Sequence, residues 1–315
     1  MNMERVDVII VNWNAGDQLR RCIASLGREI SLVERIIIVD NASIDGSLAG
    51  IEDMGLPVII VRNGENRGFA AACNQGARLS TMEFILFLNP DTALFDNSLS
   101  IPIRHMGDDE TVGITGIQLV DDSGIVARSC SRQIGPLAFI GNSFGLNRLL
   151  PNLFRSHMMD EWDHGNSRFV DHVMGAFYLI RRELFERLGG FDENFFVYYE
   201  DIDLSKRVLD LGLRISYLST AQLYHKGGGT SSQIKARRLY YSIRSKLYYS
   251  RKNFGPFASS LTFLATLVVE PIVRVSWSIC KLNGNEFFNT VKAFLLVWVN
   301  VPNILKAPIP GKHSG

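Results

Sequence analysis

The sequence predicts an α/β protein in which a doubly wound, mostly parallel sheet is flanked by helices and followed by a helical extension. Three observations predict this fold class. Short apolar runs alternate with segments of helical spacing over the first ninety residues, and such alternation is typical of parallel sheets with right-handed crossovers. Each apolar run ends in a polar loop, where ligands bind in folds of this class. Near Gln233 the composition changes to basic and apolar.

The first half of the chain supplies the core of the predicted sheet. Val6 to Val11 is an apolar strand pattern, and Asp17 then caps a segment whose apolar residues recur at helical spacing. The predicted strands are 6–11, 35–39, 57–61 and 84–88, and the predicted helices are 17–26, 45–54 and 69–79. The loops that end these strands share one edge of the sheet and contain Asn12, Asp40, Arg67 and Asp91.

The second half has weaker patterns. Between the strands, one long stretch has no clear period, and we expect a loop there. Gly189 and Gly190 end a short helix. The predicted elements are, in order, a strand and hairpin at 112–126, the long loop at 135–166, a strand region at 169–180, a helix at 181–188, an acidic helix at 200–212 and a last strand at 215–218.

Composition and charge exclude several classes of protein. With 46% apolar residues over 315 positions, the chain can bury a sizeable core. Its four cysteines form no Cys-x-x-Cys pair, which argues against a zinc ribbon, a redox motif or a disulfide scaffold and favours a reducing compartment. The first strand begins at Val6 without the basic region of a signal peptide, so none is expected. The net charge of +1 hides an asymmetry, because 16 Lys and Arg but only three acids follow Asp203.

Two strand ends carry candidate carboxylates. Asp91 follows Asn89 and Pro90 after the strand FILFL, where open α/β sheets build metal or phosphate sites. Taken alone, Asn-Pro-Asp is better explained as a turn. Asp40 ends the second strand beside Asn41. It can fix a base or ribose by hydrogen bonds or cap the next helix, and the motif alone supports both equally.

Two further loops carry groups that suit phosphate or metal. Backbone amides and Arg67 at the start of a helix can bind phosphate, although helix capping explains them too. The glycine patterns of dinucleotide and P-loop sites are absent, which opposes a nicotinamide dehydrogenase. A lone His is more often structural, but His225 with an Asp and a diphosphate makes a partial shell for Mn²⁺ or Mg²⁺. Lys226 and the glycines after it can then meet the leaving phosphate.

Glu200, Asp201 and Asp203 open a helix, where the helix dipole favours acids. The aromatic run FFVYY precedes them and would bury at least one carboxylate. Burial raises the pKa of a carboxylate towards the range that a general base needs. The segment is therefore either an ordinary acidic helix start or a catalytic one.

The order of these motifs resembles a known family. The motifs are VNWN, VDNASIDGS, ENRGFAAACNQG, LFLNPD, GGFDENFFVYYEDIDLSKRV and HKGGGTS. Together they resemble the inverting family-2 glycosyltransferases of GT-A fold, most of all their rhamnosyltransferase branch, over about residues 6–250. The resemblance implies a dTDP- or UDP-linked sugar donor, a hydroxyl acceptor and a divalent metal, Mg²⁺ or Mn²⁺.

The resemblance also implies roles for individual residues. Asp201 of the Glu-Asp motif is implied to be the catalytic base, Asp91 the metal ligand of the Asp-x-Asp motif, and His225 the completion of the metal site. The first Asp of that motif is Asn89 here, which leaves one carboxylate for the metal. The other implied site residues are Glu200 beside the base, then Asn12, Asn14, Asp40, Asn41, Arg67, Gly68, Asn74, Asn89 and Lys226 for the donor, and Gly175, Ala176 and Tyr199 for the acceptor.

Two domains are predicted, a catalytic nucleotide-sugar-binding domain at 1–232 and a helical extension at 233–315. In the extension, a basic, Tyr-rich stretch precedes apolar segments at 257–282 and 287–305. This combination is typical of an anchor on the membrane surface that meets anionic head groups. Two spanning helices, or helices packed on the core or on another subunit of a homo-oligomer, are the alternatives. Nucleic-acid binding is not expected, because no nucleic-acid-binding module accompanies the basic stretch.

With such an anchor, we expect a cytoplasmic enzyme that is peripheral on the inner face of the plasma membrane. It would extend a polyprenyl-linked glycan for a cell-envelope polysaccharide. The alternative class is a non-catalytic sugar-nucleotide-binding or assembly protein of the same fold. Asn89 favours that alternative, whereas Asp201 and His225 together with Asp91 oppose it.

Overall fold

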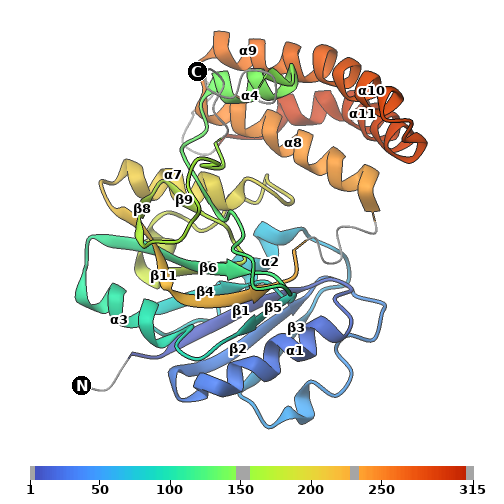
Figure 1. The fold of residues 1–315 in the computed structure, drawn as a ribbon. Helices are drawn as coiled ribbons and strands as arrows, with labels where there is room; N and C mark the ends of the chain where they lie inside the picture. The colour runs from blue at the N-terminus through green and yellow to red at the C-terminus, as the bar shows by residue number, and fades with distance from the viewer. Residues whose placement is uncertain (1–3, 147–156, 228–233, 310–315) are drawn as a thin grey trace. The chain divides into compact units, whose positions relative to one another are not determined.

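The computed structural model describes residues 4–146, 157–227 and 234–309, which form two compact units (Figure 1). Within the described chain, unit 1 contains residues 4–132, 158–193 and 200–227, and unit 2 contains 133–146, 157, 194–199 and 234–309. The aromatic segment 194–199 thus belongs to unit 2, although both of its sequence neighbours belong to unit 1. Gly228, Gly229 and part of the predicted 135–166 loop lie outside the described residues.

Unit 1 is built on a nine-stranded sheet of order β3-β2-β1-β4-β10-β6-β11-β5, with β8 paired to β11 off this path. Its strands are β1 (Val6–Asn12), β2 (Val33–Asp40), β3 (Val58–Arg62), β4 (Phe84–Leu88), β5 (Thr92–Leu94), β6 (Val112–Val120), β8 (Arg168–Val170), β10 (Phe177–Arg181) and β11 (Arg214–His225). A small second sheet pairs β7 (Cys130–Ser131) with β9 (His172–Val173). β3, β2, β1 and β4 run parallel, which confirms the predicted first half of the sheet.

One strand interrupts the parallel order. β10 runs antiparallel between β4 and β6, whereas β6 and β11 beyond it are parallel to each other. The predicted α/β class is confirmed, but the sheet is mixed. The period of apolar residues could not predict this, because it carries no information about strand direction. β11 also shifts register between Leu218 and Gln222, so it continues well past the predicted strand 215–218.

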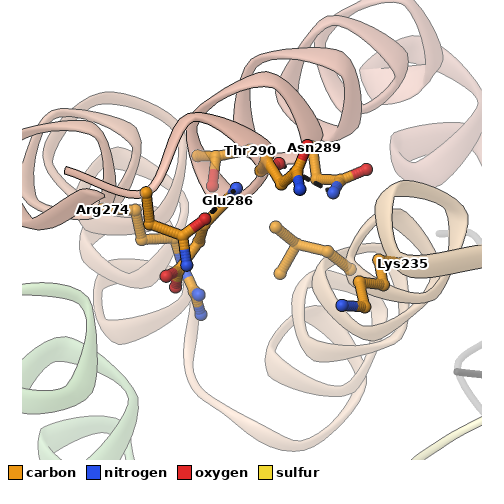
Figure 2. Close-up of a pocket in the computed structure, with 8 residues that line it drawn as sticks. Lys235, Arg274, Glu286, Asn289 and Thr290 are labelled. Carbon is orange, nitrogen blue, oxygen red and sulfur yellow. Dashed lines mark hydrogen bonds between the residues drawn. The ribbon is translucent and has the colours of Figure 1, made fainter. Parts of the chain in front are cut away.

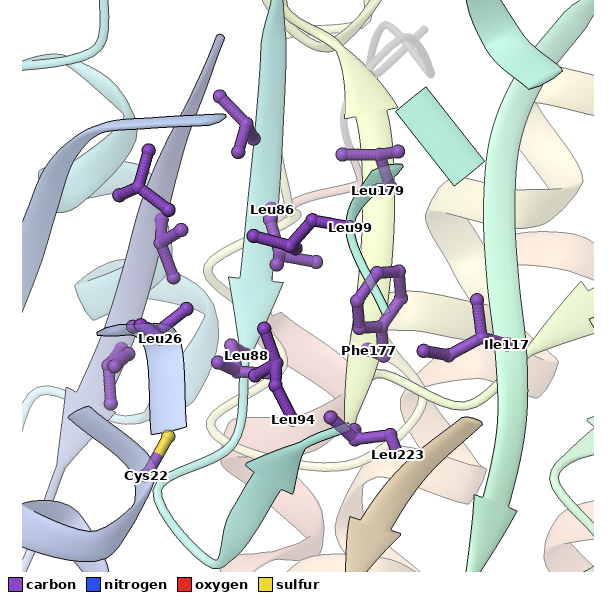
Figure 3. Close-up of a cluster of buried hydrophobic side chains, with 14 of the residues drawn as sticks. Cys22, Leu26, Leu86, Leu88, Leu94, Leu99, Ile117, Phe177, Leu179 and Leu223 are labelled. Carbon is purple, nitrogen blue, oxygen red and sulfur yellow. The ribbon is translucent and has the colours of Figure 1, made fainter. Parts of the chain in front are cut away.

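Helices cover both faces of this sheet (Figure 1). Val8 and Ile10 of β1 belong to one apolar cluster, and Ile9 and Val11 belong to another, since successive strand residues point to opposite faces. Figure 3 shows the first cluster, where side chains of β4 and β10 pack beside Leu26 of the first helix. The helices of unit 1 are α1 (Asp17–Leu26), η1 (Gly27–Leu32), η2 (Glu52–Met54), α2 (Phe69–Ala77), α3 (Ser100–Asp108), α6 (Arg182–Arg187) and α7 (Glu200–Asp210).

Two predicted segments differ from the structure. Residues 45–54, predicted as a helix, form turns and the short 3-10 helix η2. Gly46 and Gly50 have φ values of 74° and 66° there, which a continuous right-handed helix does not allow. The predicted loop 135–166 contains the helix α4 (Pro136–Ser143) in unit 2, because Pro136 at its first position is preset for helical φ.

Asp7 is a buried carboxylate at the start of β1. It accepts hydrogen bonds from Ser80 Oγ and from the two backbone amides that follow Ser80, and Arg35 Nε lies 3.1 Å from Asp7 Oδ1. We expect Asp7→Ala to lower the free energy of unfolding by about 3 kcal/mol, because these donors lose their acceptor. Urea unfolding measures the change, and Asp53→Ala on the surface is the control. A loss as small as that of the control would contradict this prediction.

Unit 2 is helical. It contains α4, α8 (Lys235–Asn253), α9 (Pro256–Leu264), the π-helical turn η4 (Ala265–Val269), α10 (Glu270–Cys280) and α11 (Gly284–Lys306). The stretch Pro256–Cys280 and α11, with 25 and 23 residues, are long and apolar enough to cross a membrane by length and composition alone. Only 22% and 28% of their most apolar windows are buried, unlike the core helices of a soluble domain.

Candidate active site

The carboxyl ends of β1 and β2 bring Asn12 and Asp40 together, because the two residues are register partners. Asn12 Nδ2 donates to Asp40 Oδ1 at 2.7 Å, and Ser43 N donates to Asp40 Oδ2 at 3.1 Å. Both Asn12 and Asp40 are buried. The Asp40 carboxylate is thus fixed in direction at the edge of the sheet.

Asn14 and Asn41 tie the neighbouring loops together. Asn14 has a φ of 51°, and its Oδ1 accepts from Ile44 N at 2.8 Å. Asn41 Nδ2 donates to Gly68 O at 3.0 Å, and Asn41 Oδ1 accepts from Asn63 Nδ2 at 2.9 Å. The loops after β1, β2 and β3 and the start of α2 therefore form one hydrogen-bonded frame beside Asp40.

Two of the predicted donor residues, Arg67 and Gly68, directly precede α2, and a third, Asn74, lies within it. Gly68 has a φ of 87° at the N-cap, and Arg67 before it is exposed. Asn74 lies further along the helix, where its Nδ2 donates to Phe191 O and its Oδ1 accepts from Phe191 N, at 2.8 and 2.9 Å. Asn74 Nδ2 also donates to Glu193 Oε1 at 3.0 Å. The amide of Asn74 is therefore occupied by the loop that follows α6, whereas Arg67 is open to solvent.

Asp91 and His225 meet because β5 pairs with the end of β11, where His225 is the register partner of Thr92. His225 Nε2 lies 3.5 Å from Asp91 Oδ1, and each side chain is 11% exposed. Lys226 N donates to Asp91 O at 3.1 Å, and the Lys226 side chain is exposed. A carboxylate oxygen and an imidazole nitrogen thus share one corner at the end of the sheet.

This corner is a pair rather than a full metal shell. Within residues 4–146, 157–227 and 234–309, no group of three or more His, Cys, Asp and Glu side chains is arranged to hold a metal ion. Asn89, two residues before Asp91, supplies an amide where a second carboxylate would stand. A divalent ion at Asp91 and His225 would therefore need oxygen ligands from a bound molecule.

Asp201 opens α7 beside Gly175, which lies between β9 and β10. Gly175 N donates to Asp201 Oδ2 at 3.0 Å, and 17% of the Asp201 side chain is exposed. A Cβ at Gly175 would lie 3.2 Å from Asp201 Oδ2, so the glycine permits this close approach. Ala176 O, one residue on, accepts from Asn89 N at 3.1 Å. The segment 175–176, which binds Asp201, is therefore connected by one backbone hydrogen bond to the segment 89–91.

A buried histidine that the sequence did not single out lies behind Asp201. His172 Nε2 is 3.7 Å from Asp201 Oδ2, and His172 Nδ1 is 3.1 Å from Ser205 Oγ, which in turn is 3.0 Å from Tyr178 OH. Burial lowers the pKa of His172, opposed in part by the charge of Asp201, so the imidazole is neutral at pH 7. Its only signal in the sequence is a place three residues before Gly175, which has no meaning until the fold is known.

Glu200 and Asp201 are neighbours in opposite environments. Glu200 is buried, and its Oε2 has no hydrogen-bond partner among the residues that the structure describes. Burial raises the pKa of Glu200 well above its ordinary value, and the charge of Asp201 raises it further. Glu200 is therefore a buried carboxyl group that favours its proton, whereas the Asp201 carboxylate is partly exposed.

The raised pKa of Glu200 predicts a pH-dependent stability. The folded chain holds the Glu200 proton more tightly than the unfolded chain, so stability falls as the pH rises from the unfolded pKa towards the folded one. Glu200→Gln removes this loss. The difference in melting temperature, variant minus unchanged chain, should therefore be larger at pH 8 than at pH 5. Thermal unfolding at both pH values tests this, and a difference that does not change with pH would contradict it.

Tyr199, an implied acceptor residue, belongs to unit 2. Its ring centroid lies 5.7 Å from that of Phe139 and 5.8 Å from that of Tyr249. Tyr198 and Tyr199 both have a φ of 70°, which is strained for residues with a side chain. The chain thus enters α7 through two left-handed residues directly before Glu200.

Comparison with known proteins identifies the class of this chain. Residues 7–189 match the model of the family described as glycosyl transferase family 2, and residues 157–226 match a model described as the N-terminal domain of galactosyltransferase. The first match covers more than half of the chain, which therefore belongs to glycosyl transferase family 2. The protein is a glycosyltransferase that uses a nucleotide sugar.

Individual relatives place the chain near rhamnosyltransferases. It is 28% identical to the N-acetylglucosaminyl-diphospho-decaprenol L-rhamnosyltransferase of Mycobacterium tuberculosis over 236 residues, which are 71% of this chain and 76% of that protein. It is 26% identical to the dTDP-rhamnosyl transferase RfbF of Shigella flexneri over 241 residues, which are 72% and 74% of the two chains. The mannosyltransferase PcManGT of Pyrobaculum calidifontis shares the fold, with a TM-score of 0.56 and 19% identity over 94% of this chain and 86% of that one.

Proposed function

We propose that this enzyme transfers rhamnose from a dTDP-linked donor to a hydroxyl of a polyprenyl-linked glycan, with inversion, during synthesis of a cell-envelope polysaccharide. One observation carries the proposal. The partly exposed carboxylate of Asp201 accepts a hydrogen bond from Gly175 N, and the next residue, Ala176, is hydrogen-bonded to Asn89 beside the corner formed by Asp91 and His225. A base beside a site for a diphosphate is the arrangement that a direct displacement at a sugar carbon needs.

The donor lies along the edge where β1, β2 and β4 end. Asp40, fixed by Asn12, accepts a hydrogen bond from the N–H of a pyrimidine base, within the frame that Asn14 and Asn41 hold. Arg67 and the amide of Gly68 stand at the start of α2, where the helix dipole favours phosphate. Asn89 and Lys226 flank the Asp91 corner on its two sides. The donor in RfbF, a dTDP-rhamnosyl transferase by name, supports thymidine as the nucleoside.

Asp91 and His225 would hold Mg²⁺ or Mn²⁺ together with the donor diphosphate. Their carboxylate and imidazole lie 3.5 Å apart and suit such an ion as a partial shell. When bound, the ion offsets the charge that develops on the departing diphosphate. The structure of PcManGT, solved with GDP-Man and Mn²⁺, supports a divalent ion. With only one carboxylate, this chain should bind the ion weakly until the donor is present.

The transfer is one displacement. The acceptor hydroxyl approaches the sugar carbon from the face opposite to the diphosphate, and its proton passes to the Asp201 carboxylate. As the new carbon–oxygen bond forms, the bond to the diphosphate oxygen breaks, and the nucleoside diphosphate leaves with the bonding electrons. His172 lies behind Asp201, and burial lowers its pKa, so it adds no positive charge beside the base. Attack from the opposite face inverts the sugar carbon.

The names of the relatives support a proposal for the acceptor and the location. The M. tuberculosis relative acts, by its name, on N-acetylglucosaminyl-diphospho-decaprenol. We therefore propose a polyprenyl-linked acceptor at the cytoplasmic face of the membrane, with Gly175 and Ala176 at the acceptor side. In this proposal residues 1–232 carry catalysis, and residues 233–315 attach the protein to the membrane.

A panel of nucleotide sugars tests the proposed function. The purified protein is incubated with dTDP-rhamnose and with UDP-sugars, with and without Mn²⁺ or Mg²⁺, and slow hydrolysis and binding of the donor are measured. We expect metal-dependent hydrolysis of dTDP-rhamnose. Binding that does not depend on metal, without turnover even when lipid-linked acceptors are added, would instead indicate a non-catalytic sugar-nucleotide-binding protein.

Gly175→Ala tests the position of Asp201. The added Cβ would lie 3.2 Å from Asp201 Oδ2, so the carboxylate must move by a few tenths of an ångström. We expect kcat to fall about tenfold with an unchanged KM for the donor, because misplacement of a catalytic group slows the chemical step. Gly27→Ala, where a Cβ meets nothing within 4 Å, is the matched control. Equal rates for the two variants would contradict this role of Gly175.

A further inference from the structure

The helices of unit 2 leave a long apolar surface open. Exposed apolar side chains recur along Pro256–Cys280 and α11 from end to end, and Phe257 and Val299 are each 78% exposed. Leu264, Ile272, Phe288 and Leu295 are also exposed along these rows. Scattered apolar side chains on a surface are normal, but rows of this length mark an interaction surface.

α8 lies beside α11 at both ends. Near the end of α8, the Arg251 guanidinium donates to the backbone carbonyls of Ile304 and Ala307, and Tyr248 OH donates to Pro308 O at 2.7 Å. At the other end, the starts of α8 and α11 line one polar cavity of about 350 Å³. Figure 2 shows Lys235 of α8 across this cavity from Glu286 and Asn289 of α11. The two helices therefore run in the same direction along their length.

A buried ion pair connects the middle of α8 to α10. Lys246 Nζ lies 2.8 Å from Glu270 Oε2 and 2.8 Å from Ser143 Oγ of α4. Arg274 Nε donates to Glu270 Oε1 at 2.9 Å. Lys246 and Glu270 are each 4% exposed. Separation of α8 from α10 would leave the buried charges unpaired, so these two helices stay packed together.

This packing decides between spanning and lying on a membrane. α8 has 19 residues and a length of about 28 Å, close to the thickness of the hydrocarbon core. If Pro256–Cys280 and α11 crossed the bilayer as a hairpin, α8 beside them would cross as well. Charged side chains are strongly unfavourable at membrane depth. The charges carried across would be Lys235, Arg237, Arg238, Arg244, Lys246, Arg251 and Lys252.

We propose that Pro256–Cys280 and α11 lie in the plane of an anionic membrane surface, with their exposed apolar side chains in the acyl region and α8 on the water side. Three exposed lysines, Lys281, Lys292 and Lys306, stand among the apolar rows and can reach anionic head groups by snorkelling. Trp277 and Trp298 are half-exposed on the same helices, and Trp favours the membrane interface. This mode of docking specifies the membrane attachment proposed above for residues 233–315 and rests on it, but it does not depend on the transfer reaction.

Vesicle binding tests the surface. The full chain should sediment with phosphatidylcholine vesicles, and more strongly when phosphatidylglycerol is included. Leu264→Glu with Val299→Glu should lower the vesicle partition coefficient by roughly tenfold, because charge replaces apolar contact area. Ile125→Glu, at an exposed apolar residue of unit 1, is the matched control and should bind like the unchanged chain. Dimers in solution without vesicle binding, or equal binding of both variants, would overturn the proposal.

Thiol labelling tests the in-plane geometry. Cys22, Cys73 and Cys130 are buried and Cys280 is exposed, so Cys280→Ser provides the background for variants with one exposed cysteine. Ser260→Cys marks the start of α9 and Asn285→Cys the hairpin turn. An impermeant maleimide added outside sealed vesicles should label both before detergent is added. Labelling of Asn285→Cys only after detergent would place the turn on the far side and overturn the proposal. Donor hydrolysis in the same samples reports on catalysis separately.

Discussion

Asp201→Asn should abolish sugar transfer, with kcat lowered by at least about 10³-fold, while donor affinity stays unchanged. The asparagine keeps the shape of the side chain but cannot take the proton of the acceptor hydroxyl, and a general base contributes up to about 10⁴-fold. In the variant, Gly175 N faces the neutral side-chain amide of asparagine instead of a carboxylate. This change affects the position of that side chain but not the donor edge. Single-turnover transfer and donor binding are the two measurements.

The control for this variant lies on the same helix. Asp210 ends α7, is exposed and pairs with Lys206 four residues earlier. Asp210→Asn should change kcat by less than about twofold, because exposed i, i+4 ion pairs contribute little. If Asp201→Asn retained activity within a few-fold of that control, Asp201 would not be the base, and the proposed mechanism would have to be abandoned.

Asp91→Asn should lower kcat by about 10³-fold and remove Mn²⁺ binding in the presence of nucleoside diphosphate. Asp91 supplies the carboxylate of its pair with His225, Asn89 stands where the motif has a second carboxylate, and His225 alone is a poor ligand set for a hard cation. Calorimetric titration of Mn²⁺ with dTDP present measures this without turnover. Asp96→Asn, at a side chain that is 80% exposed, is the control. Unchanged Mn²⁺ affinity in Asp91→Asn would rule out a metal at this corner.

The parallel half of the sheet and its polar edge could be predicted from the sequence. Apolar runs identify β1, β2, β3 and β4, and the strand-end rule places Asn12 and Asp40 side by side. The encounter of Asp91 with His225, more than a hundred residues apart, was implied by the family resemblance, since neither residue type points to the other. The structure gives the physical reason, which is the pairing of β5 with the end of β11.

What the sequence could not predict depends on long-range packing. His172 lies next to Asp201 only because β9 and α7 come together, and an isolated His carries no signal of that. Asn74 looks like a ligand-binding amide in its motif, yet the loop at Phe191 uses its hydrogen bonds. For the C-terminal extension, the composition did not decide whether the apolar segments lie on a membrane, span it, or pack on the core or on another subunit. In the proposed docking mode, the contacts of α8 with α10 and α11 favour lying on the membrane, because they tie a strongly basic helix to the apolar ones.

The position of β10 has a consequence for how the chain is made. β6 (Val112–Val120) is a nine-residue strand buried along its whole length, and both of its sheet neighbours, β10 and β11, come later in the sequence. During synthesis β6 therefore leaves the ribosome about 90 residues before β11 begins, a wait of roughly 5–20 s at usual elongation rates. One edge of β6 stays unpaired until β10 has been made and the other until β11 has been made, and an unpaired edge of an apolar strand favours intermolecular association. Shielding of the nascent β6 by chaperones or by the ribosome surface until its later partners arrive would suppress such association.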